Sequence, residues 1–355
     1  MPDEPFRTEA VRELRAYAGE HMRRESLPAL QLALARGPHR LTLSLGCQDT
    51  TRFCVYSISK PLFASALWRL ADVEGFNFST TVAELVPDLT SCPVGSVRLS
   101  DVMSHMGGFP NATADLLRLR DSRRRASVIA EWELEWEPGS RFEYHAVSAH
   151  WVLATVVSTL TGEEHDDAFH RLVTASLGLP HRILGVTDPS DYLAPVLPSD
   201  VSAEDAASWE MLLELGSQPG MGAGVPGAGC VMTAAEVADV YQAFLSNSDR
   251  LWRADILAQA TSEVVDYYWD EYAGVPANRS VGFAIAGATQ DAVRRGFGRR
   301  SSPRAFGHGG AGGQIAWAEP ATGLSFACVS NGLITDARRI EQFEVEMSDL
   351  ATACL

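Results

Sequence analysis

Two patterns of hydrophobic positions follow one another at the start of the chain. Residues 8–24 place apolar side chains at helical spacing among charged ones, which predicts a surface helix. Residues 28–37 and 39–47 alternate with a period of two around a short Gly-Pro turn, which predicts a β-hairpin. From Lys60 the spacing is helical again until Gly75, a residue type common at helix ends. The chain should therefore begin as helix, hairpin and helix.

The rest of the chain changes character twice. Residues 76–215 show helical patterns broken by proline and glycine turns, and the glycine-rich stretch 216–229 is predicted as a loop. Thr233 and Glu236 have the spacing of a capping box at a helix start. Strand-like segments and a final helix then follow, at 280–287, 312–320, 323–332 and 336–353.

This order predicts an α/β (α+β) fold. An antiparallel sheet flanked by helices is built from both ends of the chain, because its strands follow one another without crossover helices. We expect a sheet domain formed by residues 1–75 and 225–355, and an inserted, mainly helical domain at 76–224. The active site is expected at their interface.

Composition narrows the class of protein. Hydrophobic residues make up 46% of the 355, and the net charge of −16 argues against a nucleic-acid surface. No apolar run approaches the roughly 20 residues of a membrane helix, and the charged N-terminus does not resemble a secretory signal. Six cysteines without a CxxC pair favour reduced thiols over disulfides or a zinc site. We expect a cytoplasmic protein with no metal or cofactor and no nucleic-acid or membrane partner.

One lysine stands out in this composition. Lysine and arginine total 29, and Lys60 is the single lysine among them. Arginine supplies positive charge but does not lose its proton at ordinary pH, whereas a lysine can. The retained Lys60 therefore suggests proton chemistry at that position.

Ser57 and Lys60 form an SxxK sequence at the predicted start of a helix. The i, i+3 spacing places both side chains on one face. A serine hydroxyl becomes a good nucleophile when a neighbouring base takes its proton, and a lysine among apolar residues has a lowered pKa. A capping serine beside a surface lysine is the simpler alternative, and SxxK alone does not exclude it.

Four further segments strengthen the functional interpretation. Ser57-Ile58-Ser59-Lys60 resembles the SxxK motif of the penicillin-recognising serine hydrolases, which include class C β-lactamases, DD-peptidases and family VIII esterases. Other motifs of that superfamily are resembled, in family order, by residues 99–110 (LSDVMSHMGGFP), 142–146 (FEYHA), 227–234 (GAGCVMTA) and 306–313 (FGHGGAGG). Their joint occurrence is more specific than any one of them.

The resemblance implies a β-lactamase/transpeptidase-like fold and a role for each matching residue. Ser57 would attack an acyl carbonyl to form a covalent ester, while Lys60 and Tyr144 would share the proton transfers; which of the two is the base is left open. His308 would orient the substrate or support Tyr144. The backbone amides of Ser57 and Ala311 would form the oxyanion hole. Ala311 belongs to the predicted oxyanion and substrate-binding segment 309–311, together with Gly309 and Gly310.

Two departures bear on the substrate. The asparagine that follows the family tyrosine by two positions is Ala146 here, and the HGG at 308–310 replaces KTG. Both changes make β-lactam turnover less expected. The sequence therefore predicts a serine acyl-enzyme hydrolase or acyl transferase, acting on a small-molecule ester or amide and, for transfer, a small-molecule acceptor. A β-lactamase or D-amino-acid peptidase, or a non-catalytic binding protein on the same fold, are the alternatives.

Three other patterns are interpreted as structural. The GxGxxG at 222–227 follows no strand, so a dinucleotide site is not expected. The acidic run 163–167 is predicted as a solvated turn, and Arg123-Arg124-Arg125 as a helix face rather than a nucleic-acid patch. The oligomeric state is not predicted.

Overall fold

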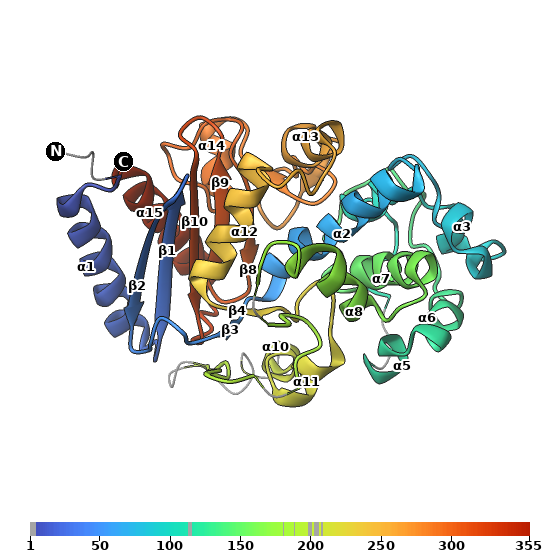
Figure 1. Cartoon of the computed structure of the whole chain (residues 1–355), viewed down its shortest axis with the longest axis horizontal. Helices are drawn as coiled ribbons and strands as arrows, with labels where there is room; N and C mark the ends of the chain where they lie inside the picture. Colours follow the sequence, from blue (N-terminus) through green and yellow to red (C-terminus); the bar gives the residue numbers. More distant parts are fainter. Residues whose placement is uncertain are drawn as a thin grey trace.

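A six-stranded antiparallel sheet organises the chain (Figure 1). The computed structural model describes residues 5–112, 116–179, 181–187, 189–197, 201, 206 and 209–355, with the backbone alone at 116 and 117. The sheet has the order β2-β1-β10-β9-β8-β7. Its strands are β1 (Leu30–Arg36), β2 (His39–Leu45), β7 (Ala284–Ile285), β8 (Phe306–Gly310), β9 (Gln314–Glu319) and β10 (Leu324–Ser330). The predicted fold class is confirmed, with both ends of the chain in one antiparallel sheet.

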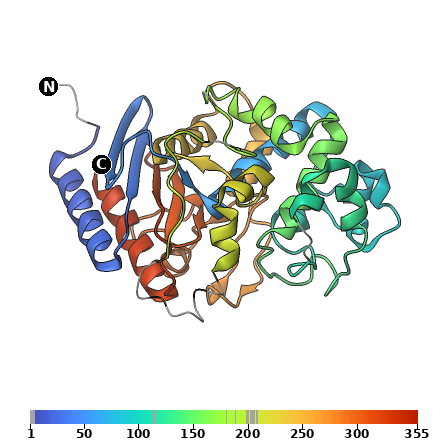
Figure 2. The same ribbon diagram turned by 90° about the horizontal axis from the view of Figure 1, so that it is seen from below.

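Helices cover both faces of this sheet. Along β1, Leu30, Leu32 and Leu34 pack toward α1 (Thr8–Glu25) and α15 (Ala337–Ala353). The intervening small residues pack toward the other core, which contains α12 (Ala234–Ser246). The period of two along a strand thus divides the side chains between two cores, and alanines let α12 approach closely. In both views α1 and α15 lie side by side at one end of the molecule (Figures 1 and 2).

The opposite end of the molecule is built mainly from short helices (Figure 1). These are α3 (Val82–Leu85), α4 (Leu99–Met103), α5 (Leu116–Arg120), α6 (Ser122–Ile129), α7 (Ser148–Thr161) and α8 (His165–Phe169), with 3₁₀ turns at Pro87–Leu89 and Pro93–Ser96 and a π turn at His170–Thr174. Helices α10 (Glu210–Leu215) and α11 (Gln218–Ala223) lie nearer the middle of the molecule (Figure 1). The long buried helix α2 (Ser59–Glu74) packs against α7 and α8 and begins beside the sheet.

Smaller elements complete the chain. Two short two-stranded sheets pair β3 (Phe53–Cys54) with β4 (Val231–Met232) and β5 (Trp269–Asp270) with β6 (Val275–Pro276). Along the chain, helix α13 (Ala254–Ser262) precedes β5, and helix α14 (Thr289–Arg294) lies between β7 and β8. None of these six elements has a strong enough local pattern to be predicted. The described helices include none that is long and apolar enough to span a bilayer, and all six cysteines are free thiols.

Local predictions hold where capping residues mark the ends. α2 ends at Gly75 in the left-handed conformation, and Thr233 and Glu236 form the expected capping box of α12. The prediction of a loop over residues 216–229 is wrong in part. Residues Gln218–Ala223 form α11, because the Ser217 hydroxyl accepts a hydrogen bond from the Gly220 amide and caps the helix.

Two charged segments reach into the interior. His165 and Asp166 are buried, so the predicted solvated turn is wrong. Residues 123–125 lie on α6 as predicted, and Arg125 is fully buried. Arg125 contacts His165, while Asp166 pairs with Arg120. The sequence shows the charges but not the partners that allow them to be buried.

Strand β7 is shorter than predicted. The sequence pattern predicts a strand at 280–287, and the structure has one at Ala284–Ile285.

Candidate active site

A strained turn presents Ser57 at the start of α2. The turn Tyr56–Ile58 is a 3₁₀ helix that runs directly into α2, and Tyr56 has the left-handed backbone angle φ of 45°. Tyr56 is buried and its hydroxyl donates to the Leu212 carbonyl at 2.9 Å, which holds the turn in place. Non-glycine residues rarely adopt this conformation, and they do so where the surroundings enforce it, often at functional sites. Ser57 remains partly exposed beside its buried neighbours.

The Lys60 ammonium group lies within hydrogen-bond distance of three oxygens. Its Nζ atom is 3.1 Å from the Ser57 hydroxyl, 2.7 Å from the Ala146 carbonyl and 3.0 Å from the Gly227 carbonyl. Two of these partners are carbonyls, which can accept but never donate a hydrogen bond. When Lys60 is neutral, its two N–H bonds match the two carbonyls, and its lone pair is left for the Ser57 hydroxyl. The arrangement therefore suits removal of the serine proton by Lys60.

Burial makes the neutral form of Lys60 more accessible. The side chain is 1% exposed and has no carboxylate partner among the described residues. Burial lowers the pKa of Lys60 below its ordinary value; Tyr144 acts in the opposite direction, and the charge of Arg279 adds to the lowering. A buried ammonium without a counter-ion is costly, so the amine gives up its proton more readily than a surface lysine does.

Tyr144 lies directly against this lysine. The Lys60 Nζ atom is 4.9 Å from the centre of the Tyr144 ring. The ring also packs against His105 at 4.6 Å between centroids and against His308 at 6.1 Å. The structure thus brings together all four predicted catalytic residues, Ser57, Lys60, Tyr144 and His308, although they come from distant parts of the chain.

His308 is a buried, neutral imidazole on strand β8. Its Nδ1 atom lies 2.7 Å from the Gly309 carbonyl and donates to it, which leaves Nε2 as an acceptor without a partner among the described residues. Burial, followed by the charges of Arg279 and Lys60, holds the pKa of His308 well below its ordinary value. His308 can therefore accept a hydrogen bond from a substrate or a tyrosine hydroxyl, but it does not supply positive charge.

The predicted oxyanion segment runs beside the serine turn. A Cβ atom on Gly310 would lie 2.8 Å from the Val55 carbonyl oxygen, so only glycine lets β8 approach the chain just before Ser57 this closely. Gln314 ties the two segments together, since its side-chain amide donates to the carbonyls of Cys54 at 3.0 Å and Ala311 at 3.5 Å. Strand β8, which ends with Gly309 and Gly310 just before Ala311, thus packs against the turn that carries Ser57.

Several residues at the site were not singled out from the sequence. His105 has a positive φ of 68° and accepts the His145 backbone amide at 3.2 Å, so it fixes the segment that carries Tyr144. Gln314 and Arg279 lie far from Ser57 and Tyr144 in the sequence. His105 lies inside one of the recognised motifs and could have been found there, whereas Gln314 and Arg279 gave no local signal.

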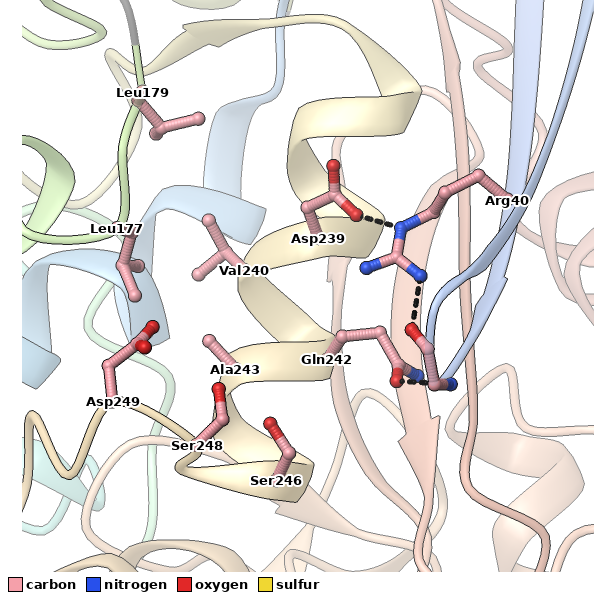
Figure 3. Close-up of a pocket in the computed structure, with 11 residues that line it drawn as sticks. Arg40, Leu177, Leu179, Asp239, Val240, Gln242, Ala243, Ser246, Ser248 and Asp249 are labelled. Atoms are coloured by element: carbon pink, nitrogen blue, oxygen red, sulfur yellow. Dashed lines mark hydrogen bonds and ion pairs between the residues drawn. The ribbon is translucent and has the colours of Figure 1, made fainter.

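Other features of the molecule do not compete for this role. A cavity of about 490 Å³ lies between α12, the β1–β2 hairpin and residues 177–179, and it includes the Arg40–Asp239 ion pair (Figure 3). None of the predicted site residues lines it, so it is not where an acyl group would meet Ser57. Within the described ranges, no group of three or more His, Cys, Asp or Glu side chains is arranged to hold a metal ion.

Comparison with known proteins assigns the chain to a family. A family model described as Beta-lactamase matches residues 14–348. The chain belongs to the beta-lactamase family. It is thus a serine hydrolase of the β-lactamase-like superfamily, as the motifs predicted.

The proteins similar to this chain have names that indicate esterase, β-lactamase or acyltransferase activity. The chain is 25% identical over 317 residues to "Esterase/beta-lactamase LipL" of Mycobacterium tuberculosis, covering 79% of this chain and 69% of that protein. It is similar in structure to a family VIII carboxylesterase (TM-score 0.77, 21% identity, 98% of each chain). A second similar structure is EstCE1, described as a hydrolase with promiscuous acyltransferase activity (TM-score 0.75, 17% identity, 96% of this chain and 98% of that one). At these identities the structural likenesses show the fold.

Proposed function

We propose that the protein is an acyl-transferring serine enzyme in which Ser57 is the nucleophile and Lys60 its base. Lys60 takes the hydroxyl proton as the Ser57 oxygen attacks the carbonyl of a small-molecule ester or amide. The bond to the leaving alcohol or amine breaks as Tyr144 gives that group its hydroxyl proton, and the protonated Lys60 then returns a proton to Tyr144. Water or an acceptor alcohol or amine next attacks the Ser57 ester while Lys60 takes its proton. The acid or the transferred acyl product leaves, and Lys60 returns the proton to the Ser57 oxygen.

The observation that carries this proposal is the environment of Lys60. A lysine that is 1% exposed, 3.1 Å from a serine hydroxyl and matched to two carbonyls has its lone pair available for that hydroxyl. A capping serine beside a surface lysine, the simpler alternative, does not fit. Ser57 makes no capping hydrogen bond at α2, and Lys60 does not reach solvent.

The oxyanion of the tetrahedral intermediate would be stabilised by the backbone amides of Ser57 and Ala311. The contact of Gly310 with Val55 and the bridge made by Gln314 fix these two segments relative to each other. Preorganised amides of this kind contribute about 100- to 1,000-fold in rate. The proposal needs no metal or cofactor.

Esters are preferred over β-lactams as substrates in this proposal. Ala146 contributes its backbone carbonyl to Lys60, and its side chain offers no amide to a substrate. His308 is neutral where the family motif has a lysine. We also propose that donor and acceptor are small molecules of the cytoplasm, as the sequence led us to expect.

Short-chain p-nitrophenyl esters test the function directly. Wild-type protein is expected to release p-nitrophenol with saturation kinetics, and adding a primary alcohol or amine should divert part of the acyl group from acid to a new ester or amide. Ampicillin and nitrocefin are run in parallel and should be turned over far more slowly. Absence of turnover with every ester would favour the binding-protein alternative, and faster turnover of nitrocefin would favour the β-lactamase.

A further inference from the structure

Arg279 brings a second cation to the proposed acyl site. It lies between β6 and β7, where its backbone pairs with that of Asp266 in both directions at 3.1 Å. Its guanidinium carbon is 5.7 Å from the centre of the Tyr144 ring and 5.9 Å from that of Phe142. The Tyr144 ring is therefore shared between the Arg279 guanidinium and the Lys60 ammonium group.

No residue that the structure describes forms an ion pair with this guanidinium. Across the part of the chain that the structure describes, the Arg279 side chain has no hydrogen bond and no ion pair, and its Nε atom is buried without a partner. Asp266 is close enough to feel its charge, but the two do not form an ion pair; Asp266 Oδ1 accepts from the Tyr268 amide at 2.8 Å. A guanidinium carries five N–H donors, so several remain available here.

The other described side chains at the site provide no anion that pairs with Arg279. The imidazoles of His105 and His308 are kept neutral, since burial and the charge of Arg279 hold the pKa of each well below its ordinary value. Lys60 faces two carbonyls and a hydroxyl. An arginine fork with free donors beside aromatic rings matches a planar carboxylate.

We propose that Arg279 is a specificity-determining residue that binds a carboxylate of the substrate while Ser57 attacks the ester or amide. This inference rests on the proposed function and narrows its substrates to acyl donors that carry a carboxylate group. In this chain the recognition would come from the segment before β7, not from the HGG segment on β8. Phe142 and Tyr144 would form the apolar wall against which the guanidinium is held.

Matched ester pairs test the inference. In the first pair, p-nitrophenyl hydrogen glutarate is compared with its methyl ester, so the carboxylate lies on the acyl side. In the second pair, 3-acetoxybenzoic acid is compared with methyl 3-acetoxybenzoate, so it lies on the leaving-group side. For at least one pair, wild type should show a higher kcat/KM with the carboxylate, by about 10- to 100-fold, the range for one charge-assisted contact.

Variants assign this preference to the residue. Arg279→Gln should reduce the ratio of the two kcat/KM values by about 10- to 100-fold. Arg279→Lys, which keeps the charge but loses the fork, should retain part of it. Arg15→Gln, on the exposed face of α1, removes one positive charge far from the site and should leave the ratio unchanged. Thermal unfolding of each variant checks the fold.

The outcomes separate the inference from the proposed function. Turnover of the neutral esters without a preference for either carboxylate overturns the inference alone. Equal loss with neutral and anionic esters in Arg279→Gln also overturns it, because it assigns Arg279 a purely structural role. If wild type turns over none of the four esters, the proposed function fails and the inference fails with it.

Discussion

Lys60 and Arg125 are two buried cations in opposite environments. Arg125, on α6, is 0% exposed, and it donates to the carbonyls of Leu119 and Arg120 and pairs with Glu164 at 3.4 Å. Lys60 is 1% exposed but has carbonyls and a serine hydroxyl in place of a carboxylate. Both cations lie over an aromatic ring, so the difference is the counter-ion.

The comparison separates a structural charge from a chemical one. A buried charge that is paired and saturated with acceptors is stable as an ion, whereas one without a carboxylate is driven toward its neutral form. Burial lowers the pKa of Arg125 to about 10, but the carboxylates of Glu164 and Asp166 oppose this, and the group stays charged at neutral pH. Lys60 can lose its proton and Arg125 does not, which is why we assign the chemistry to Lys60.

Exchanging the residue type at Lys60 should have the largest effect of the variants compared. Lys60→Arg keeps a positive charge but cannot release its proton, so kcat/KM for p-nitrophenyl esters should fall by about 1,000-fold. Lys60→Met removes the charge and should cause a loss of similar size. A much smaller loss in Lys60→Arg than in Lys60→Met would show that charge, and not proton transfer, is what matters.

Wild-type activity should also depend on pH through this residue. The base is active when unprotonated, so kcat/KM should rise with pH through the pKa of Lys60, which burial lowers below its ordinary value. The rise should be absent from the residual activity of Lys60→Met. An identical rise in that variant would assign the titration to another group.

Tyr144→Phe should have the next largest effect. The variant retains the ring that packs against Lys60 and His105 but removes the hydroxyl that we propose for proton transfer to the leaving group. We expect kcat to fall by about 100-fold, at the lower end of the range for acid-base catalysis, because Lys60 remains. The loss should be greater for amides than for p-nitrophenyl esters, whose leaving group hardly needs a proton. Equal losses on both would contradict the assigned role.

Arg125→Lys makes the opposite exchange in the helical region. A lysine cannot reproduce the planar donor fork that binds two carbonyls and Glu164, so the free energy of unfolding should fall by about 1–3 kcal/mol. Activity of the folded protein should change by less than about twofold, since no reacting group contacts Arg125. Chemical denaturation and ester kinetics on the same sample measure both. A large loss of kcat without loss of stability would erase the contrast with Lys60.

Glu344 is a buried acid to which the same principle applies, because a buried charge without a counter-ion is driven toward its neutral form. It lies on α15, with no hydrogen bond or ion pair recorded for its carboxyl group within the described chain, and burial raises its pKa to about 8. The raised pKa means that folding favours the protonated form. Its stabilising contribution is therefore complete below the unfolded value of 4.5 and is lost as the pH rises through about 8.

Glu344→Gln tests this at constant shape. Wild type should lose stability between roughly pH 5 and 8 with a slope of up to about 1.4 kcal/mol per pH unit from this group. The variant should have a flatter profile over that range. Matching profiles for the two proteins would show that the Glu344 carboxyl group is hydrated or paired. That result would also contradict the inference that burial favours the neutral form of Lys60.

Local patterns predicted more of the fold than of the site. The hairpin at β1–β2, helix α2 and its end at Gly75, and the capping box at Thr233 follow from nearby residues, and the structure has them. Ser57 and Lys60 were detectable because one helical turn relates them. Arg279 lies between β6 and β7 and Gln314 on β9, both far from Ser57 in the sequence, and the burial of Arg125 depends on Glu164 and His165. No local pattern could reveal these contacts.

Covalent labelling of Ser57 tests the central claim most directly. Intact-protein mass is measured after exposure to a fluorophosphonate, comparing wild type with Ser57→Ala, Lys60→Arg and Ser59→Ala. Ser59 is a matched control two residues away, because its hydroxyl is buried and accepts the Cys230 amide at 3.1 Å. We predict one adduct per chain in wild type and Ser59→Ala, sharply slower labelling in Lys60→Arg, and none in Ser57→Ala. No adduct on wild type, or an adduct that persists in Ser57→Ala, would contradict the account.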